Sequence, residues 1–373
     1  MIALLALSAF LQDVRLPPFL DLDGEVSRQV VVDREKGQYL GHPTTALLED
    51  GKTILCVYPK GHGKGPILYQ KSVDGGRTWS GRLITPANWI TSQETPTIHR
   101  VTGADGKKRL ILFSGLYPAR IASSEDDGAT WTELAPLGDW GGIVVMGSVE
   151  AVRGKPGHLM AFFHDDGRFF RKGGKATGIF TLLQTRSEDA GRTWSEPKSI
   201  QTSGAVHLCE PGSVRSPDGK DLALLLRENR RQSPSQFMLT RDEGQTWESP
   251  KPLHPALFGD RHTARQAPDG RLVISFRDVP PKGTNSLTAG DWVAWVGTFD
   301  DIIHGRPGQA KIRLKKNHKG GDCAYPGVEI LPDGTFVLTT YGHWTPGEPP
   351  YILSVRLKLD EVDSRVGVKP AAR

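Results

Sequence analysis

Ionisable and aromatic side chains recur in this chain directly before or directly after short apolar runs that are rich in β-branched residues. Histidine, glutamate, arginine and tyrosine at such places can transfer protons and bind anions. A random surface would not repeat them beside successive apolar runs, so we interpret them as the lining of one functional mouth. Before an apolar run stand His42, Glu94, His207, Glu210, Arg261, His262 and Tyr325; after one stand Lys60, His62, His164, Asp165, Arg227, Arg277, Asp278 and Tyr341.

A short turn signal joins the apolar runs in pairs. Asp-Gly, or Pro-Gly in one case, stands between two β-rich runs such as residues 53–58, which follow the first of these dipeptides. This is a strong hairpin signal, and we expect each pair to form the first two strands of a unit. The sequence therefore predicts six units. Their hairpin turns begin at Asp50, Asp105, Pro156, Asp218, Asp269 and Asp333.

A second phrase, Ser/Thr-x-Asp-x-Gly-x-Thr-Trp, occurs four times, and its spacing of about 50 to 60 residues indicates a copied unit. In the first copy Asp74 can accept backbone N–H bonds, Gly76 supplies a positive φ, and Trp79 can pack between neighbouring sheets. Each copy fits the turn between a third and a fourth strand. The chain is therefore predicted to be all-β, a six-bladed β-propeller of four-stranded antiparallel blades. The copies are residues 72–79, 124–131, 187–194 and 240–247.

One domain accounts for the chain. We expect residues 21–373 to form a single propeller after a possible signal or N-terminal segment at 1–20, with residues 28–32 and 351–359 sharing the last blade. A chain with 37% hydrophobic residues, 43 Gly, 27 Pro and no long helical pattern agrees with this. Residues 1–12 are apolar and too short to span a bilayer, and they favour a secreted or periplasmic protein.

Charge and cysteine content narrow the classes of partner. The formal net charge is +5, and Lys and Arg are interspersed with acids, which disfavours nucleic acid as a partner. Cys56, Cys209 and Cys323 lack metal-type spacing and are expected to be buried free thiols. No pair of histidines or acids has the spacing of a strong metal motif, so we expect no metal and no cofactor.

The segments that begin Glu210-Pro-Gly-Ser-Val and Tyr325-Pro-Gly-Val-Glu, with the repeats and six units, resemble the sialidase (neuraminidase) superfamily over about residues 35–360. In that family a tyrosine attacks the anomeric carbon, a glutamate takes its proton, an aspartate is the acid/base, and three arginines bind the substrate carboxylate. The resemblance implies Tyr325 as nucleophile, Glu210 as its base and Arg227 as one of the arginines. It also implies an exo-glycosidase whose carbohydrate substrate ends in sialic acid or a related acidic sugar. A neutral phenol suits such a substrate, because an anionic nucleophile would repel its carboxylate.

The chain departs from the family pattern at two places. Gly41-His42-Pro43 stands where the family has its first carboxylate-binding arginine, and the loop expected to hold the acid/base aspartate reads Lys60-Gly-His62-Gly-Lys64. Loss of one charge-paired contact to a bound anion costs a few kcal/mol, so the acidic sugar need not be sialic acid.

Other residues of the mouth offer replacements. We expect Arg277 to stand in for the third arginine, and His62, Asp278 or Asp165 to donate the proton. Further substrate contacts are expected from His42, Lys60, Lys64, His164, His262 and Tyr341.

Two other functions fit the same pattern. A propeller-shaped polysaccharide lyase acting on uronic acids would use a tyrosine or histidine of the mouth as its base, and its unsaturated product would absorb in the near ultraviolet. In a non-catalytic sugar-binding propeller, Glu210 and Tyr325 would be wall residues only. The gathering of ionisable groups at one end of the ring argues against the second alternative.

Overall fold

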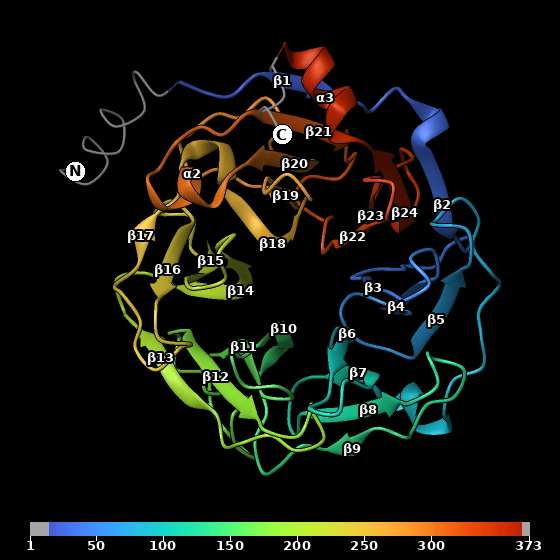
Figure 1. Cartoon of the computed structure of the whole chain (residues 1–373), viewed down its shortest axis with the longest axis vertical. Helices are drawn as coiled ribbons and strands as arrows, with labels where there is room; N and C mark the ends of the chain where they lie inside the picture. Colours follow the sequence, from blue (N-terminus) through green and yellow to red (C-terminus); the bar gives the residue numbers. More distant parts are fainter. Residues whose placement is uncertain (1–14, 368–373) are drawn as a thin grey trace.

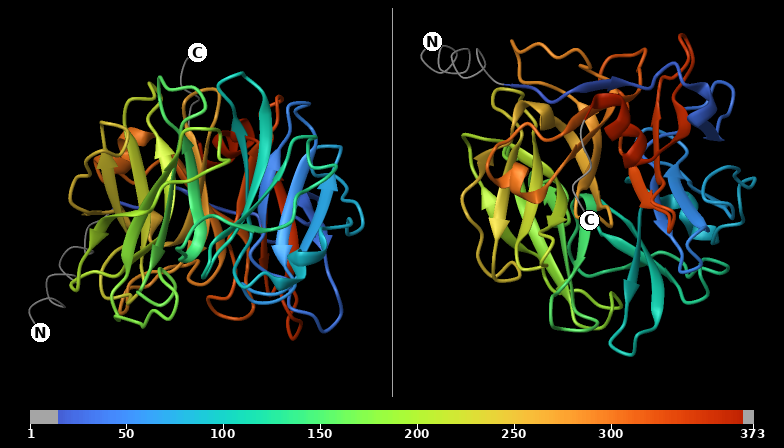
Figure 2. Two further views of the ribbon diagram at one scale, coloured as in Figure 1. Left: turned by 90° about the horizontal axis from the view of Figure 1, so that it is seen from below. Right: turned by 45° about the horizontal axis from the view of Figure 1, so that its top comes forward.

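The computed structural model describes residues 15–367 and shows six sheets around a central axis, which confirms the all-β six-bladed propeller (Figure 1). Seen from the side, the strands of the blades run roughly along the axis of the ring (Figure 2). The expected signal segment, residues 1–12, lies outside the described residues. Within residues 15–367 no helix is long and apolar enough to cross a membrane.

The blades follow one another along the chain, and in each the strands are antiparallel to their sequence neighbours. The first four blades comprise β3 (Thr44–Leu47), β4 (Ile54–Pro59) and β5 (Ile67–Ser72); β6 (Thr97–Thr102), β7 (Lys108–Ser114), β8 (Arg120–Ser124) and β9 (Ala135–Pro136); β10 (Ile143–Ala151), β11 (Leu159–Asp165), β12 (Thr181–Ser187) and β13 (Lys198–Thr202); and β14 (Leu208–Arg215), β15 (Leu222–Glu228), β16 (Gln236–Thr240) and β17 (Lys251–Pro252).

The last two blades include strands from the N-terminal part of the chain. Blade five comprises β18 (Gly259–Gln266), β19 (Leu272–Asp278), β20 (Trp292–Gly297), β21 (Ala310–Lys315) and β1 (Phe19–Asp21), and blade six comprises β22 (Gly327–Ile330), β23 (Phe336–Gly342), β24 (Tyr351–Leu357) and β2 (Gln29–Asp33).

Short helices connect or flank the blades, namely η1 (Val26–Arg28), η2 (Ala87–Thr91), η3 (Pro255–Leu257), α2 (Phe299–Ile303) and α3 (Leu359–Val366).

Two blades depart from the predicted four strands. Blade one has three, because beyond Trp79 the chain makes isolated backbone hydrogen bonds to β5, such as Leu83 N–H to the Tyr69 carbonyl at 2.8 Å, instead of a continuous ladder. Blade five has five, because β1 adds to β21 in parallel, with Leu20 opposite Ile312.

The ring is closed by strands from both ends of the chain. β2 pairs antiparallel with β24, with Gln29 opposite Val355 and Val30 opposite Ser354, as the sequence predicts. β2 is the outer strand of blade six and β22 is its inner strand. The pairing therefore fixes the N-terminal strand in the last blade and leaves no gap in the ring.

Each Asp phrase forms the turn that follows the third strand of its blade. In the first copy Asp74 Oδ1 accepts the Thr78 N–H at 2.9 Å, and Asp74 Oδ2 accepts the Thr78 hydroxyl at 2.6 Å. Ser72 Oγ accepts the Gly76 N–H at 2.8 Å, and Gly76 has φ +77°. The predicted turn chemistry is confirmed.

The tryptophan of the phrase packs against the preceding blade. Trp194 of blade three meets Phe113 of blade two edge-on, with ring centroids 5.5 Å apart, and Trp247 of blade four meets Phe162 of blade three in the same way. These contacts belong to the hydrophobic clusters between neighbouring blades. The repeated tryptophan is therefore an element of blade-to-blade packing.

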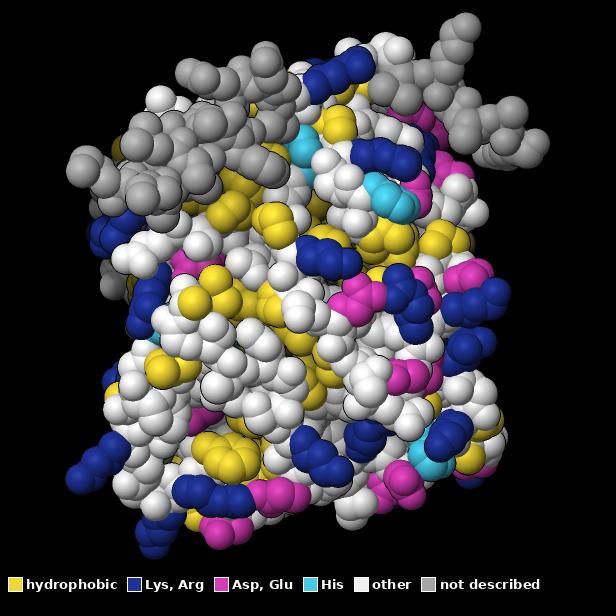
Figure 3. All heavy atoms as spheres, turned by 90° about the vertical axis from the view of Figure 1, so that its left-hand side faces the viewer, with side chains coloured by type: hydrophobic (Ala, Val, Ile, Leu, Met, Phe, Trp, Pro, Cys, Tyr) yellow, Lys and Arg dark blue, Asp and Glu magenta, His cyan; other side chains and the backbone are white. Residues whose placement is uncertain are grey.

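The Asp-Gly and Pro-Gly dipeptides all lie between the first and second strands, as predicted. Their glycines have positive φ, for example +73° at Gly219. The starts of the first strands and the ends of the second strands therefore meet at the opposite end of the ring. On the side of the ring that carries β16 and β17, Lys and Arg lie among Asp and Glu, so this face has no single sign of charge (Figure 3).

Replacing Trp194 by Ala should lower the free energy of unfolding by about 3–5 kcal/mol, because the indole is 8% exposed and a cavity would open between two blades. Chemical denaturation followed by fluorescence measures this. Leu287→Ala, at a side chain 73% exposed, is the control and should change stability by less than about 0.5 kcal/mol. Equal effects of the two substitutions would contradict the packing role of Trp194.

Candidate active site

A cavity of about 300 Å³ lies at the mouth end of the ring. Five blades contribute to its wall from the starts of first strands and the ends of second strands, where the sequence places the functional mouth. Seven of the predicted site residues lie there. They are His42, His62, Lys64, His164, Glu210, Arg227 and Tyr325, and Glu94 and Arg168 lie beside them.

A larger cavity, about 810 Å³, opens at the hairpin end of the central channel and contains neither Glu210 nor Tyr325. Its two inner-strand carboxylates accept hydrogen bonds from the next blade, Glu150 from Ser213 at 2.5 Å and Glu329 from Thr45 at 2.7 Å. These contacts hold inner strands together, and we place the candidate active site in the smaller cavity.

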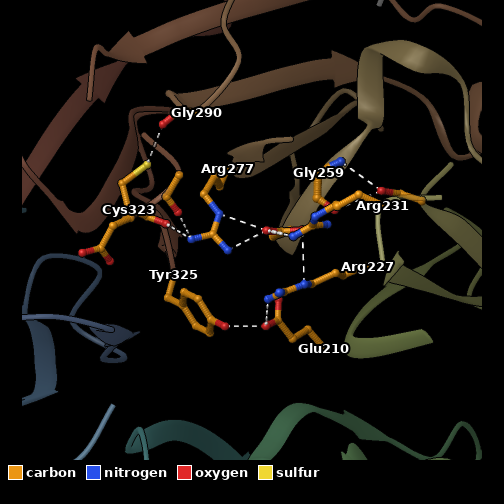
Figure 4. A network of polar contacts seen from close by, with 12 residues as sticks. Glu210, Arg227, Arg231, Gly259, Arg277, Gly290, Cys323 and Tyr325 are labelled. Carbon is orange, nitrogen blue, oxygen red and sulfur yellow. Dashed lines mark hydrogen bonds and ion pairs between the residues drawn. The ribbon is translucent and has the colours of Figure 1, made fainter. Parts of the chain in front are cut away.

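Tyr325, Glu210 and Arg227 form a connected chain on the wall of that cavity (Figure 4). The Tyr325 hydroxyl donates to Glu210 Oε1, and Arg227 Nη1 donates to the same oxygen at 2.6 Å. Tyr325 comes from the segment before β22, whereas Glu210 and Arg227 come from β14 and β15. Blades four and six therefore meet in this contact.

The protonation states suit a phenol that gives up its proton to a carboxylate. Burial alone would raise the pKa of Glu210, but the Arg227 guanidinium lowers it below its usual range, so Glu210 is ionised. Burial and the Glu210 charge raise the pKa of Tyr325 well above its usual range. Tyr325 is therefore a neutral phenol with a proton acceptor already in place.

A backbone irregularity aims Glu210 at the cavity. The β14–β15 register shifts between Cys209 and Gly212, and Glu210 has φ +53°, a strained value for a residue with a side chain. A Cβ at Gly212 would lie 2.0 Å from the His262 carbonyl oxygen, so only glycine permits the close approach of β14 to blade five. Arg261, with φ +54°, occupies the matching bulge in β18.

Asp260 anchors three arginines behind this pair. Its side chain is fully buried and accepts two hydrogen bonds from Arg231, at 2.5 and 2.6 Å, and two from Arg277, at 2.9 and 2.5 Å. Arg227 Nε lies 3.6 Å from Asp260 Oδ1. Burial alone would raise the pKa of Asp260, but Arg277, Arg227 and Arg231 lower it to about 2. Asp260 was not among the residues expected at the site, although it precedes Arg261 directly in the sequence.

Arg261 brings a further positive charge under the nucleophile candidate. Its guanidinium carbon lies 5.7 Å from the centre of the Tyr325 ring, and it donates to the Gly147 carbonyl at 2.7 Å. Within residues 15–367 no carboxylate lies within 4.0 Å of this guanidinium, and the side chain is buried. Its charge favours the anionic form of Tyr325.

A group of aromatic and imidazole rings forms the blade-one side of the mouth. The His42 ring lies 4.5 Å from the rings of both Tyr325 and Tyr341, and the Tyr341 hydroxyl meets His42 Nε2 at 3.2 Å. Burial and the neighbouring His62 place the pKa of His42 well below its usual range, so His42 is neutral. His42 therefore brings no positive charge to the cavity, and the Tyr341 hydroxyl contacts its ring.

Known proteins resemble this chain in their repeats, their sequence and their fold. The family of BNR repeat-like domains matches residues 24–337. The chain belongs to the BNR repeat-like family. A sialidase from Micromonospora viridifaciens is 24% identical over 310 residues, which are 74% of this chain and 45% of that protein. This BNR repeat-like chain thus spans less than half the length of its curated relative.

Solved structures share the fold at low identity. The GH93 α-L-arabinofuranosidase of Fusarium graminearum matches with TM-score 0.64 and 13% identity over 90% of this chain and 98% of that one. An intramolecular trans-sialidase from Ruminococcus gnavus matches with TM-score 0.57 and 14% identity over 87% and 95%. The BNR repeat-like propeller therefore has the overall fold of both kinds of enzyme.

Two predicted residues at strand ends have structural partners instead. Asp278, a predicted proton donor, is 1% exposed and accepts from Ser286, Thr288 and Lys311, the last at 3.0 Å. Lys60, a predicted substrate contact, pairs with Glu35 at 3.0 Å. Neither residue lines the cavity, so both expectations are corrected.

Two further residues that were predicted at the site lie outside the mouth cavity. Asp165 accepts the N–H groups of Gly167, Phe169 and Phe170 at 2.6, 3.2 and 3.2 Å, and so holds the loop after β11. His262 donates from Nε2 to the Leu257 carbonyl at 2.8 Å and faces the larger cavity. Both act in the scaffold of this BNR repeat-like propeller, contrary to the predicted roles in proton donation and substrate binding.

Glu94 is a cavity residue to which the sequence analysis gave no role. Its Oε1 accepts the Thr95 N–H at 2.9 Å and its Oε2 accepts the Val144 N–H at 3.4 Å. Burial raises the pKa of Glu94, and the nearby Glu210 adds to this, which favours the protonated acid. In the sequence, the position of Glu94 just before β6 is the signal that could have assigned it a role in the site.

The cysteines are unpaired in the structure. Cys56, Cys209 and Cys323 are free and buried, as predicted. Among the described residues no group of three or more histidines, cysteines and acids is arranged to hold a metal ion.

Replacing Asp260 by Asn should lower the free energy of unfolding at pH 7 by about 3–5 kcal/mol, because three buried arginines lose their countercharge. The lowered pKa of Asp260 means that its stabilising effect is present above about pH 4 and is lost as the pH falls toward 2. Denaturation at pH 7 and pH 3 should therefore show a smaller pH dependence in Asp260→Asn than in the native protein.

Asp300→Asn is the matched control, since Asp300 is 54% exposed and pairs with Arg306 at the surface. It should cost no more than about 1 kcal/mol. A loss in Asp260→Asn no larger than in this control would contradict the anchoring role of Asp260.

Proposed function

We propose that this chain is an exo-acting glycosidase that hydrolyses a terminal acidic sugar, with Tyr325 as nucleophile and Glu210 as its base. The observation that carries the proposal is the hydrogen-bonded chain Tyr325–Glu210–Arg227 on the wall of the mouth cavity. In the first half of the reaction the Tyr325 oxygen attacks the anomeric carbon while its proton passes to Glu210. Water then releases the sugar, and Glu210 returns the proton to Tyr325.

The charge of the site favours an anionic substrate. Three arginines, Arg227, Arg231 and Arg277, pair with two ionised carboxylates, Glu210 and Asp260, and the buried Arg261 forms no ion pair among the described residues. The surplus is positive, and Lys64 at the rim of the cavity adds to it. A sugar carboxylate would offset this surplus, and a neutral phenol would not repel it.

The size of the cavity and the relatives support the same conclusion. About 300 Å³ is the lower end of the range for small-molecule sites, which suits one terminal sugar better than an internal segment of a chain. The curated relative is a sialidase, and solved structures of similar fold include a trans-sialidase and an arabinofuranosidase. All three names describe enzymes that act at a glycosidic bond.

Tyr325→Phe should lower release of aryl alcohol from an acidic glycoside at least ~10³-fold, because the nucleophile is lost. The assay uses a panel of sialyl, uronyl and neutral aryl glycosides. Tyr69→Phe is the matched control, since it removes a buried hydroxyl that donates to the Gly128 carbonyl at 3.0 Å, outside the cavity. This control should retain activity within about threefold.

Two results would contradict the assignment. Full activity of Tyr325→Phe would exclude the tyrosine as nucleophile. No release from any glycoside, with near-ultraviolet absorbance appearing on a polyuronate, would instead identify a lyase.

A second candidate is a glycosidase of neutral sugars that uses two carboxylates. Glu94 and Glu210 line the same cavity, and the raised pKa of Glu94 beside the lowered pKa of Glu210 is the division expected of an acid and a nucleophile. The fold similarity to an arabinofuranosidase agrees with this candidate.

Glu94→Gln distinguishes the two candidates. If two carboxylates carry the reaction, this variant should lose at least ~10²-fold in kcat on a neutral aryl furanoside, whereas Tyr325→Phe should change it by less than about tenfold. If Tyr325 carries the reaction, the order of the two losses reverses and the active substrate is acidic. The substitution keeps the size of the side chain and leaves one amide oxygen to accept a backbone N–H from Thr95 or Val144.

A further inference from the structure

A chain of hydrogen bonds runs along the rim of the mouth cavity from Asp322 through Tyr39 to His62. The Tyr39 hydroxyl lies 2.7 Å from Asp322 Oδ1 and 2.6 Å from His62 Nδ1. The three residues come from different parts of the sequence, namely the segment before β3, the β4–β5 loop and the segment before β22. None of these contacts is needed to close the ring, which is held by β2 and β24.

The direction of each hydrogen bond follows from the chemistry of the groups. Burial alone would raise the pKa of Asp322, but Tyr39 and His343 lower it, so Asp322 is ionised and only accepts. Burial and Asp322 raise the pKa of Tyr39, so Tyr39 keeps its proton and donates it to Asp322. The Tyr39 oxygen must then accept from His62 Nδ1–H. His62 Nε2 is the ring nitrogen left for substrate.

His62 differs from the other two histidines of the cavity. Its side chain is 68% exposed, whereas His42 and His164 are 4% and 3% exposed. Burial lowers the pKa of His164 to about 4, and His42 is neutral for the same reason, so neither is a ready proton donor. Asp322 Oδ1 lies 3.8 Å from His62 Nδ1, within ion-pair distance.

The loop that carries His62 holds a tight shape. Gly61 has φ +154°, and a Cβ there would lie 2.4 Å from the Lys64 carbonyl oxygen. The His62 ring packs edge-on against His42 at 4.8 Å, and His42 in turn lies 4.5 Å from Tyr325. His62 and Tyr325 therefore stand on the same cavity with His42 between them. Two other titratable groups of the cavity wall, Glu94 and Lys64, lie near this loop.

We propose that His62 is the catalytic acid/base of the glycosidase reaction, and that Asp322 and Tyr39 are positioning residues that fix its tautomer. The inference rests on the glycosidase function proposed above. It explains how this chain transfers a proton with a histidine in the loop where related sialidases are expected to have an aspartate.

The proposed reaction has two steps, in which bonds to the anomeric carbon form and break and each proton has a donor and an acceptor. As the C–O bond to the leaving group breaks, His62, protonated at both ring nitrogens, transfers its Nε2 proton to the departing oxygen, and the alcohol leaves with the bonding electron pair. Tyr325 bonds to the anomeric carbon and its proton passes to Glu210. Neutral His62 Nε2 then takes a proton from water as the water oxygen bonds to the anomeric carbon. The Tyr325–carbon bond breaks, and Glu210 returns the proton to the Tyr325 oxygen.

The test compares leaving groups. His62→Ala should lower kcat/KM about 10²- to 10⁴-fold on a methyl glycoside of the sugar that the native protein hydrolyses, but less than about tenfold on the 2,4-dinitrophenyl glycoside, which departs without protonation. Added imidazole should restore part of the lost activity on the methyl glycoside. Tyr39→Phe should show the same dependence on leaving group, with a smaller loss.

His304→Ala is the control, since His304 is 54% exposed at the C-cap of helix α2 and pairs with Asp300. It should act on both substrates at the native rate. Equal losses of His62→Ala on the two substrates, or a leaving-group dependence in Glu94→Gln instead, would overturn the assignment of His62 while leaving the glycosidase function intact. No hydrolysis of any glycoside by the native protein would overturn the glycosidase function itself, and with it this inference.

Discussion

Closure of the ring by β2 and β24 is the constraint on which the remaining structure depends. Six sheets that pack face to face around an axis leave open edges unless the last blade is completed by the start of the chain. Once the ring is closed, the inner strands converge, and residues hundreds of positions apart meet at one end of the channel. The contact between Glu210 and Tyr325, 115 residues apart, exists only because of this convergence.

The convergence of the inner strands also brings several buried positive charges together, and Asp260 supplies their countercharge. Buried guanidinium groups repel one another, and isolated buried charges are strongly destabilising. Asp260 lies between Arg231, Arg277 and Arg227 and keeps them together behind the cavity wall. With these charges held in place, Glu210 remains ionised next to Arg227, so the carboxylate that accepts the hydrogen bond of Tyr325 depends on the same buried network.

The architecture was predictable from sequence to a greater degree than the site. Turn chemistry is local, so Asp74 predicts its turn correctly, and six hairpin signals predict six blades. The site depends instead on which way a side chain points at a strand end. Arg277 and Asp278 are neighbours in β19 and therefore face opposite sides, and only Arg277 reaches the buried network. Asp260 has no local signature and is recognisable only through partners that the fold brings to it, such as Arg231. The absence of a fourth strand in blade one could not be predicted from local sequence either. Its Asp phrase forms the same turn as in the other blades, so the difference arises from tertiary contacts.

The two departures from the sialidase pattern are linked by the structure. His42 stands where the resemblance to sialidases predicts an arginine, and it is neutral, so it contributes no fixed positive charge beside Tyr325. An arginine at this place would stand next to His62, whose ring lies 4.8 Å from His42, and would oppose an imidazolium there. A histidine acid/base on the β4–β5 loop and a neutral residue at position 42 are thus mutually consistent. The positive charge under Tyr325 is then supplied from blade five, by Arg261.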